Sequence, residues 1–151
     1  MPSEVTNYFY TIIVMGTIAF MVTGAFNTHA AGLQITAETR ELKTLLESVA
    51  AEGAELAALT EATGATTKIS MKLPAVIGEK YFWLRLSSDT SGVWIEGAFG
   101  TTWTGDSQYA VDIPGIVSAS GTYKGGYGTL SLNCTDQGAG PVLTLGRWED
   151  D

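Results

Sequence analysis

The first pattern along the chain is an uninterrupted apolar run. Residues 8–26, YFYTIIVMGTIAFMVTGAF, contain no Asp, Glu, Lys, Arg or Pro, and their only polar side chains are threonines and tyrosines. As an α-helix, about 19 residues at about 1.5 Å per residue extend about 28 Å, close to the hydrocarbon thickness of a bilayer. A helix that is apolar on every side needs apolar surroundings, so we expect this run to be buried in lipid or against copies of itself.

Small residues recur inside this run and favour close helix packing. Gly16, Gly24 and Gly32 follow each other at intervals of eight residues, and glycines in an apolar helix let a second helix approach closely. The same residues are also common in any membrane helix, so lipid and protein surroundings fit the pattern equally well. The residues expected in helix–helix contacts are Ile12, Ile13, Gly16, Ala19, Phe20 and Gly24.

The residues ahead of the apolar run do not resemble a secretory signal. MPSEVTN contains neither Lys nor Arg and includes the acidic Glu4, whereas a secretory signal begins with a positively charged region. We therefore expect the apolar segment to be retained.

A one-sided apolar pattern follows the run. Residues 28–63 contain no proline, and their leucines and a valine recur at helical spacing, which is typical of an amphipathic helix with one buried face. The side chains expected to pack against the rest of the chain are Leu42, Leu45, Val49, Leu56 and Leu59. Gly64 suits the position just past a helix end. The two parts together predict one helix over residues 4–62, with Asn27–Thr28 or Gly32 as the favoured place for a bend.

After Gly64 the apolar period changes to two, which indicates strands. The predicted strands are 68–73, 81–86, 93–99, 109–113, 116–123, 128–133 and 142–145. The Lys124-Gly125-Gly126 turn predicts a hairpin between the fifth and sixth strands. Several short strands with frequent turn signals favour a small antiparallel β-sandwich or barrel, so the expected fold class is α+β, with the sheet covering the amphipathic half of the helix.

The expected domain organisation follows from this change of period. Residues 1–64 form the N-terminal helix, of which 4–27 are the membrane or filament-core segment and 28–64 the amphipathic part. Residues 65–151 form a β-rich head domain.

Composition argues against catalysis and against nucleic acid as a partner. The chain has 8 basic and 16 acidic residues and a net charge of −8, whereas phosphate binding requires clustered Lys and Arg. A single cysteine, Cys134, and a single histidine, His29, allow no intrachain disulfide and give no metal-ligand or catalytic cluster. We therefore expect a protein that is not an enzyme and holds no metal or cofactor.

Three weaker features remain. Asn133-Cys134-Thr135 is an N-x-[ST] sequon in a predicted turn, so Asn133 is a possible N-glycosylation site. Four acidic residues lack calcium-loop spacing and are expected to be solvated: Asp89, Asp106, Asp112 and Asp136. Four tryptophans fit either glycan stacking or packing in a core or subunit interface, and we expect packing: Trp83, Trp94, Trp103 and Trp148.

The layout of the whole chain resembles the archaeal type IV pilin and archaellin class. An uncharged apolar N-terminal segment runs into an amphipathic helix and then into a Gly- and Thr-rich β-domain. Residues 69–81, ISMKLPAVIGEKY, resemble the junction of a strand, Leu-Pro, Ile-Gly and Tyr in pilin-like proteins, and the GTYKGG segment at 121–126 fits their later strands. These motifs are short and of low specificity.

The resemblance implies a subunit of an extracellular filament. In that class the N-terminal helices bundle into an apolar core, with the subunits held in the membrane before assembly, and the β-domains form the outer sheath. Glu4 matches an acidic position that meets a neighbour's terminal amine during assembly, although a lone solvated acidic residue explains it equally well. The chain departs from the class because no basic leader precedes Val5.

The sequence therefore leads to two hypotheses about function. The first is a structural subunit of an extracellular helical filament, a homo-oligomer formed through the N-terminal helices. The alternative is a membrane-anchored cell-surface binding or pilus-accessory protein that acts through its β-domain, with surface or glycan ligands left undefined.

Overall fold

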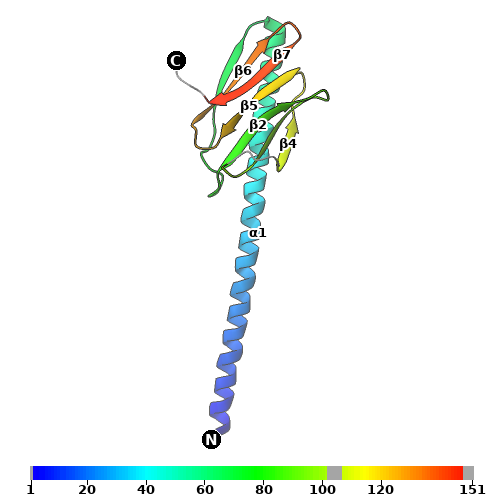
Figure 1. Ribbon diagram of the computed structural model, residues 1–151. Coiled ribbons are helices and arrows are strands. Elements are labelled where there is room, and N and C mark those ends of the chain that lie inside the picture. Colours follow the sequence, from blue (N-terminus) through cyan, green and yellow to red (C-terminus); the bar gives the residue numbers. More distant parts are fainter. Residues whose placement is uncertain (1, 102–106, 148–151) are drawn as a thin grey trace. The chain divides into compact units, whose positions relative to one another are not determined.

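The computed structural model describes residues 2–101 and 107–147, with side chains described from residue 4 onward. One helix precedes seven strands (Figure 1): α1 (Pro2–Thr63), β1 (Thr67–Lys72), β2 (Phe82–Ser88), β3 (Val93–Phe99), β4 (Tyr109–Asp112), β5 (Ser118–Lys124), β6 (Thr129–Asp136) and β7 (Pro141–Arg147). The chain divides into two compact units, Met1–Thr39 and Arg40–Asp151.

Helix α1 is continuous through the positions expected to favour a bend. Residues 27, 28 and 32 are all helical, and the hydroxyl groups of Thr28 and Thr36 donate to carbonyls four residues earlier, at Gly24 and Gly32. The helix ends as predicted at Gly64, which has a φ of +66°. The amide of Gly64 donates to the carbonyl of Thr60 at 2.8 Å, a bond that satisfies one of the last helix carbonyls.

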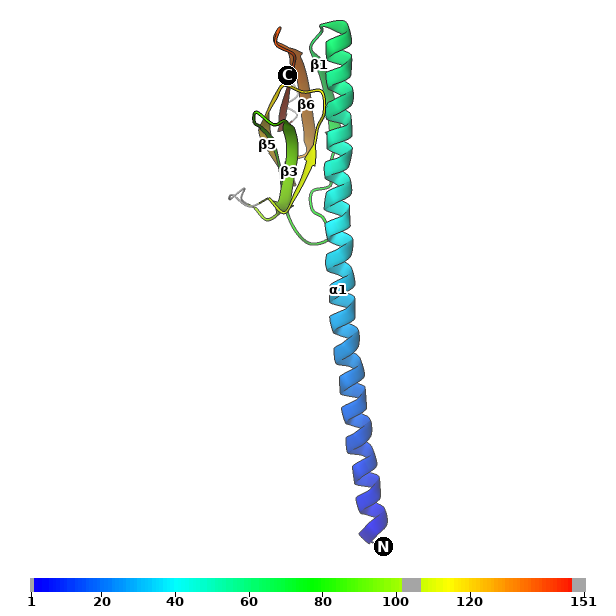
Figure 2. The same cartoon turned by 90° about the vertical axis from the view of Figure 1, so that its right-hand side faces the viewer.

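The seven strands form one open sheet in the order β1-β6-β7-β5-β2-β3-β4. All neighbouring pairs are antiparallel except β5 and β7, which are parallel. The expected α+β class is confirmed, with a long N-terminal helix followed by a mostly antiparallel sheet. The closed barrel or two-sheet sandwich is not formed. A second sheet is not needed to bury the core, because the part of α1 from Arg40 onward covers one face of the sheet (Figure 2).

The predicted hairpin between the fifth and sixth strands is also wrong. β5 and β6 are neighbours in sequence, but β7 lies between them and pairs with both. This central position fills both hydrogen-bonding edges of β7 and buries Leu143 and Leu145. The turn at residues 124–127 instead directs β6 away from β5, and the amide of Gly125 donates to the carbonyl of Phe82 at 2.8 Å.

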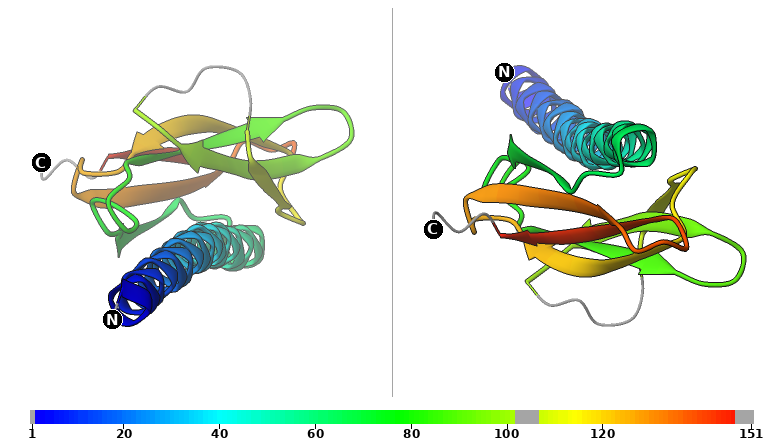
Figure 3. Two further views of the ribbon diagram at one scale, coloured as in Figure 1. Left: turned by 90° about the horizontal axis from the view of Figure 1, so that it is seen from below. Right: turned by 90° about the horizontal axis from the view of Figure 1, so that it is seen from above.

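The core of the second unit lies between α1 and the sheet (Figure 3). Leu42, Leu46 and Val49 of the helix are fully buried together with Leu84 and Ile95 of the sheet. The helix therefore supplies one wall of the core. This explains why the units divide inside α1, between Thr39 and Arg40, whereas the expected division lies at the helix end, between residues 64 and 65.

Candidate assembly surface on the apolar helix

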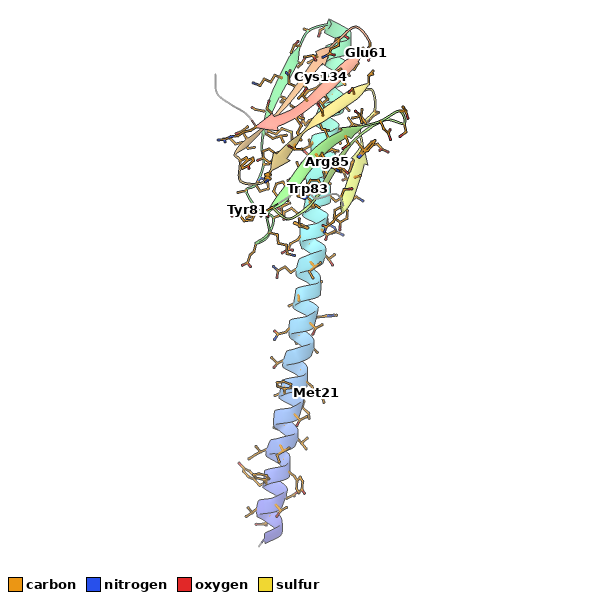
Figure 4. The ribbon with its side chains drawn as sticks, viewed as in Figure 1. Met21, Glu61, Tyr81, Trp83, Arg85 and Cys134 are labelled. Atoms are coloured by element: carbon orange, nitrogen blue, oxygen red, sulfur yellow. The ribbon has the colours of Figure 1, made fainter. Side chains whose placement is uncertain are left out.

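The first part of α1 is apolar and exposed around its whole circumference. Large side chains leave half or more of their surface in contact with solvent, for example Ile12 (55%), Phe20 (82%) and Met21 (68%). Side chains project from every side of this helix around Met21 (Figure 4). Exposed apolar patches of such extent mark protein or membrane contact sites. We call residues 5–35 of α1 the apolar helix segment.

Threonine hydroxyls of the apolar helix segment are paired within the helix. The hydroxyl groups of Thr11, Thr17 and Thr23 donate to the carbonyls of Asn7, Ile13 and Ala19 at 2.8–2.9 Å. A hydroxyl that is paired inside its own helix needs no partner from outside, so it can enter an apolar environment without the penalty of an unsatisfied group.

The predicted helix-contact residues all lie on this exposed surface. A Cβ atom added at Gly16, Gly24 or Gly32 would meet no atom of the chain within 4 Å outside the helix backbone. Ile12, Ile13, Ala19 and Phe20 are likewise exposed. Nothing in the chain itself therefore requires glycine at these positions.

A shallow apolar hollow lies farther along the same segment. Ala25 and Ala30 leave space between the larger side chains of Phe26, His29 and Leu33, and the open hollow measures about 440 Å³. Because small residues alternate with large ones here, the helix surface has a depression that an apolar side chain of a neighbouring helix can fill.

The residues predicted to pack the helix on the head differ in burial. Leu42, Leu45, Val49 and Leu56 are buried in the core. Leu59 is 48% exposed, because Thr60 turns inward instead. Thr60 is fully buried and shares a hydrogen bond of 3.2 Å with the hydroxyl of Thr67. Residue 60 lies one helical turn after the buried Leu56. The helical period therefore indicated that residue 60 is buried, although its side chain is polar.

The remaining predicted positions are separate from this surface. Glu4 is exposed in the first turn of α1. Asn133 lies inside strand β6, so its expected placement in a turn is wrong, because Leu132 and Cys134 on either side are drawn into the core. The Oδ1 atom of Asn133 is buried without a hydrogen-bond partner.

Two of the described aspartates accept hydrogen bonds from nearby backbone amides. Asp89 accepts hydrogen bonds from the amide groups of Ser91 and Gly92 in the β2–β3 turn, and Asp136 accepts one from the amide of Gly138. The hydroxyl of Ser91 and the amides of Ser91 and Gly92 lower the pKa of Asp89. Among the described residues no group of three His, Cys, Asp or Glu side chains is placed to hold a metal ion. Asp106 lies outside the described residues.

Sequence analysis missed an ion pair on the sheet. Arg85 of β2 lies opposite Glu96 of β3 in register, and its Nε donates to Glu96 Oε1. The guanidinium also lies 5.7 Å from the centre of the Trp83 ring. Ser87 donates a further hydrogen bond of 2.9 Å to Glu96. Strand alternation puts Arg85 and Glu96 on one face, but only the register brings them together.

Burial and hydrogen bonding act in opposite directions on Glu96. Burial raises the pKa of this carboxyl, whereas hydrogen bonds from Arg85, Ser87 and Ser107 and the charge of Arg85 lower it more, so the net pKa is below the ordinary value.

Of the other predicted positions, Trp83 is buried and Trp94 half-buried, while Trp103 and Trp148 lie outside the described residues.

By length and composition, α1 contains one stretch able to cross a membrane, and none of that stretch is buried within the chain. Signal sequences and core helices of soluble proteins can have the same length and composition, although a core helix is mostly buried. Comparison with protein-family models, curated proteins and solved structures gave no significant match.

Proposed function

We propose that this chain is a structural subunit of an extracellular helical filament of the type IV pilin or archaellin kind. The apolar helix segments of many copies pack together as the filament core, and the sheets lie outward. Before assembly the same segment holds the subunit in the membrane. The proposed role is architectural and involves no catalysis, metal or cofactor.

One observation carries this proposal. The apolar helix segment exposes large side chains on all sides, while its threonine hydroxyls are already paired inside the helix. Full burial of one Val, Leu, Ile or Phe side chain is worth about 1.5–3 kcal/mol. A segment with more than ten such side chains therefore gains far more from apolar neighbours than surface contacts of the second unit can supply.

The open glycine positions favour neighbouring helices over lipid alone. Gly16 and Gly24 have free space beside them, and glycine reduces helix propensity by about 1 kcal/mol relative to alanine. Close contact between helix backbones gives a reason for retaining glycine at these positions.

A membrane-anchored surface protein is the second candidate, because the same segment has the length and composition of a membrane span. In that case a single copy suffices, and the second unit works alone by binding a surface or glycan ligand.

Electron microscopy distinguishes the two candidates. The full chain is purified in detergent, the detergent is removed by dialysis without lipid, and the product is imaged beside material sheared from the cell surface. We expect uniform filaments whose only subunit is this chain. Amorphous aggregates, together with a monodisperse monomer when lipid nanodiscs are supplied and no filaments on cells, would overturn the proposal and favour the anchor.

A further inference from the structure

The face of the sheet that points away from α1 carries exposed side chains on β1, β5 and β7, whereas Trp83 and Glu96 on its β2–β3 part are buried. Residues that alternate with core positions lie on this face, and the register aligns them across four strands. Lys68 is opposite Asn133, Asn133 is opposite Thr144, and Thr144 is opposite Ser120. Lys68, Thr144 and Ser120 are exposed, and the one helix among the described residues lies on the other side of the sheet (Figures 2 and 3). We call it the outer sheet face.

The outer sheet face is basic although the chain is acidic. Four basic residues and two acidic ones occupy it in the described strands: Lys68, Lys72, Arg85, Lys124, Glu96 and Asp112. Glu96 is paired with Arg85, so this pair adds no net charge to the face. Lys68 and Lys72 are exposed on the edge strand β1, and Lys124 is half-buried opposite Trp83.

The opposite side of the same unit is acidic. From residue 40 onward, α1 carries five glutamates outside the core, against only Arg40 and Lys43: Glu41, Glu47, Glu52, Glu55 and Glu61. Lys43 lies 3.9 Å from Glu47 and partly offsets that residue. We call this the acidic helix face.

A small hollow on the outer sheet face suits a carboxylate side chain. It measures about 220 Å³ and is bordered by Trp83, Thr122, Lys124 and Tyr127. Ammonium and hydroxyl groups at its border donate hydrogen bonds to a carboxylate, and bonds that involve charged partners are the stronger ones. The volume is below the about 300–1,000 Å³ typical of sites for drug-sized ligands, which fits one side chain.

We propose that the outer sheet face of one copy of this chain binds the acidic helix face of the next copy. The two faces lie on opposite sides of one sheet, so a single chain cannot bring its own pair together. Their charges are complementary, which promotes association and fixes register. A contact between two different faces repeats in one direction and builds a ring or an open filament. The inference rests on the proposed function, because it requires copies of the chain as neighbours.

Zero-length carbodiimide cross-linking tests this contact directly. Full-length chain in two isotope labels is mixed, the detergent is removed as above, and lysine–glutamate bonds between differently labelled peptides are identified by mass spectrometry. We expect Lys68, Lys72 or Lys124 joined to Glu41, Glu52 or Glu55 of another copy. Inter-chain bonds that join other regions, or none at all, would overturn the inference.

Charge reversal provides the second test. Lys124→Glu and the edge-strand variant Lys72→Glu should each lower the cross-links formed by the remaining lysines of this face by about tenfold, because like charges now face each other. Adding Glu52→Lys and Glu55→Lys should restore them. Lys80→Glu is the matched control, since residue 80 lies between β1 and β2, outside the strands of this face; circular dichroism verifies the fold of each variant.

The outcomes separate the inference from the proposed function. If filaments form and neither Lys72→Glu nor Lys124→Glu changes the cross-links of the remaining lysines or the filament yield, the sheet-to-helix contact is wrong and the filament proposal stands. If no filament and no inter-chain cross-link forms with any variant, both are wrong.

Discussion

Among single residues, Glu96 shows how the sheet stabilises a charge that is almost removed from water. The residue is 6% exposed, and its carboxylate accepts hydrogen bonds from Arg85 and Ser87. Removal of one partner from such a pair leaves the other charge poorly solvated, and this loss usually exceeds the net worth of the intact pair.

Glu96→Gln should therefore lower the free energy of unfolding at pH 7 by about 1–3 kcal/mol. Because the pKa of Glu96 is lower in the folded chain than in the unfolded chain, the contribution of the carboxylate is fully present above pH 4.5, the ordinary pKa of the group, and is lost as the pH falls through the folded value. The difference between the two proteins should shrink in that acidic range. Denaturant titration in detergent, followed by tryptophan fluorescence, measures it.

Glu79→Gln is the control for this titration, because residue 79 is exposed between β1 and β2. We expect this variant to have the same free energy of unfolding as the wild type at pH 7 and at pH 3. A Glu96→Gln difference that is equally large at pH 7 and pH 3 would show that packing, and not the carboxylate charge, causes the loss.

Gly121 is a position at which backbone geometry tolerates no side chain. Its φ is +130°, and a Cβ atom there would overlap the carbonyl of Leu145 on β7. Gly121→Ala should lower the free energy of unfolding by about 2 kcal/mol or more. Gly146→Ala in β7 is the matched control because nothing lies within 4 Å of its added Cβ. Equal thermal unfolding of the two variants would contradict the account of the β5–β7 pairing.

Among the elements, α1 combines two kinds of surface in one continuous helix. From Arg40 onward one face is buried on the sheet, whereas the apolar helix segment is exposed all round. The first surface stabilises the fold of the second unit, and the second surface is available for partners. Substitutions in the two parts should therefore separate folding from assembly.

Leu46→Ala should destabilise the second unit by about 2–5 kcal/mol, because Leu46 is fully buried and its truncation leaves a cavity. Leu59→Ala, on the same stretch of helix but 48% exposed, should cost less than about 1 kcal/mol. Thermal unfolding in detergent compares the pair. A larger loss at Leu59 than at Leu46 would mean that the helix packs on the sheet through a different face.

Gly16→Leu and Gly24→Leu should leave the second unit folded but prevent assembly. The added side chains meet nothing within the chain, yet they hold two helix backbones apart. Val14→Leu, at a position that already carries a large side chain, should have a milder effect. Filament yield after detergent removal is the readout, and normal yield from both glycine variants would contradict close packing at these positions.

The sequence predicted the elements better than their arrangement. Period 3.6 and period 2 patterns located α1 and all seven strands, because burial on one face leaves a local signature. The insertion of β7 between β5 and β6 left no such signature, since strand order depends on contacts between residues distant in sequence. Leu59 was predicted to pack on the sheet, whereas Thr60 occupies that place, for a related reason. Periodicity identifies the buried face of a helix, but the shape of the sheet that packs against it decides which residues at the margin of that face are buried.

For the candidate site, the apolar run was fully visible in the sequence, because its composition alone defines it. The Arg85–Glu96 pair was not, since it depends on the β2–β3 register. The basic character of the outer sheet face was hidden for the same reason. Its lysines come from strands that lie far apart in sequence, and the net charge of the chain has the opposite sign.

For the whole molecule, the account makes apolar burial the dominant source of cohesion between copies. Each large apolar side chain buried at a helix contact contributes about 1.5–3 kcal/mol, whereas an exposed ion pair contributes about 0–1 kcal/mol and is screened by salt. In the proposed filament, contacts between the outer sheet face and the acidic helix face should therefore guide register and rate, and the apolar helix segments should hold the copies together.

Sedimentation of assembled material tests this ranking most directly. Filaments formed by the full chain are incubated in 1 M NaCl or in membrane-solubilising detergent, and the pelleted fraction is measured and imaged. The account predicts that filaments persist in salt and dissociate in detergent, which replaces the apolar neighbours of each helix. Filaments that dissolve in 1 M NaCl but survive the detergent would contradict it and assign the cohesion to charged contacts between the sheet-bearing units.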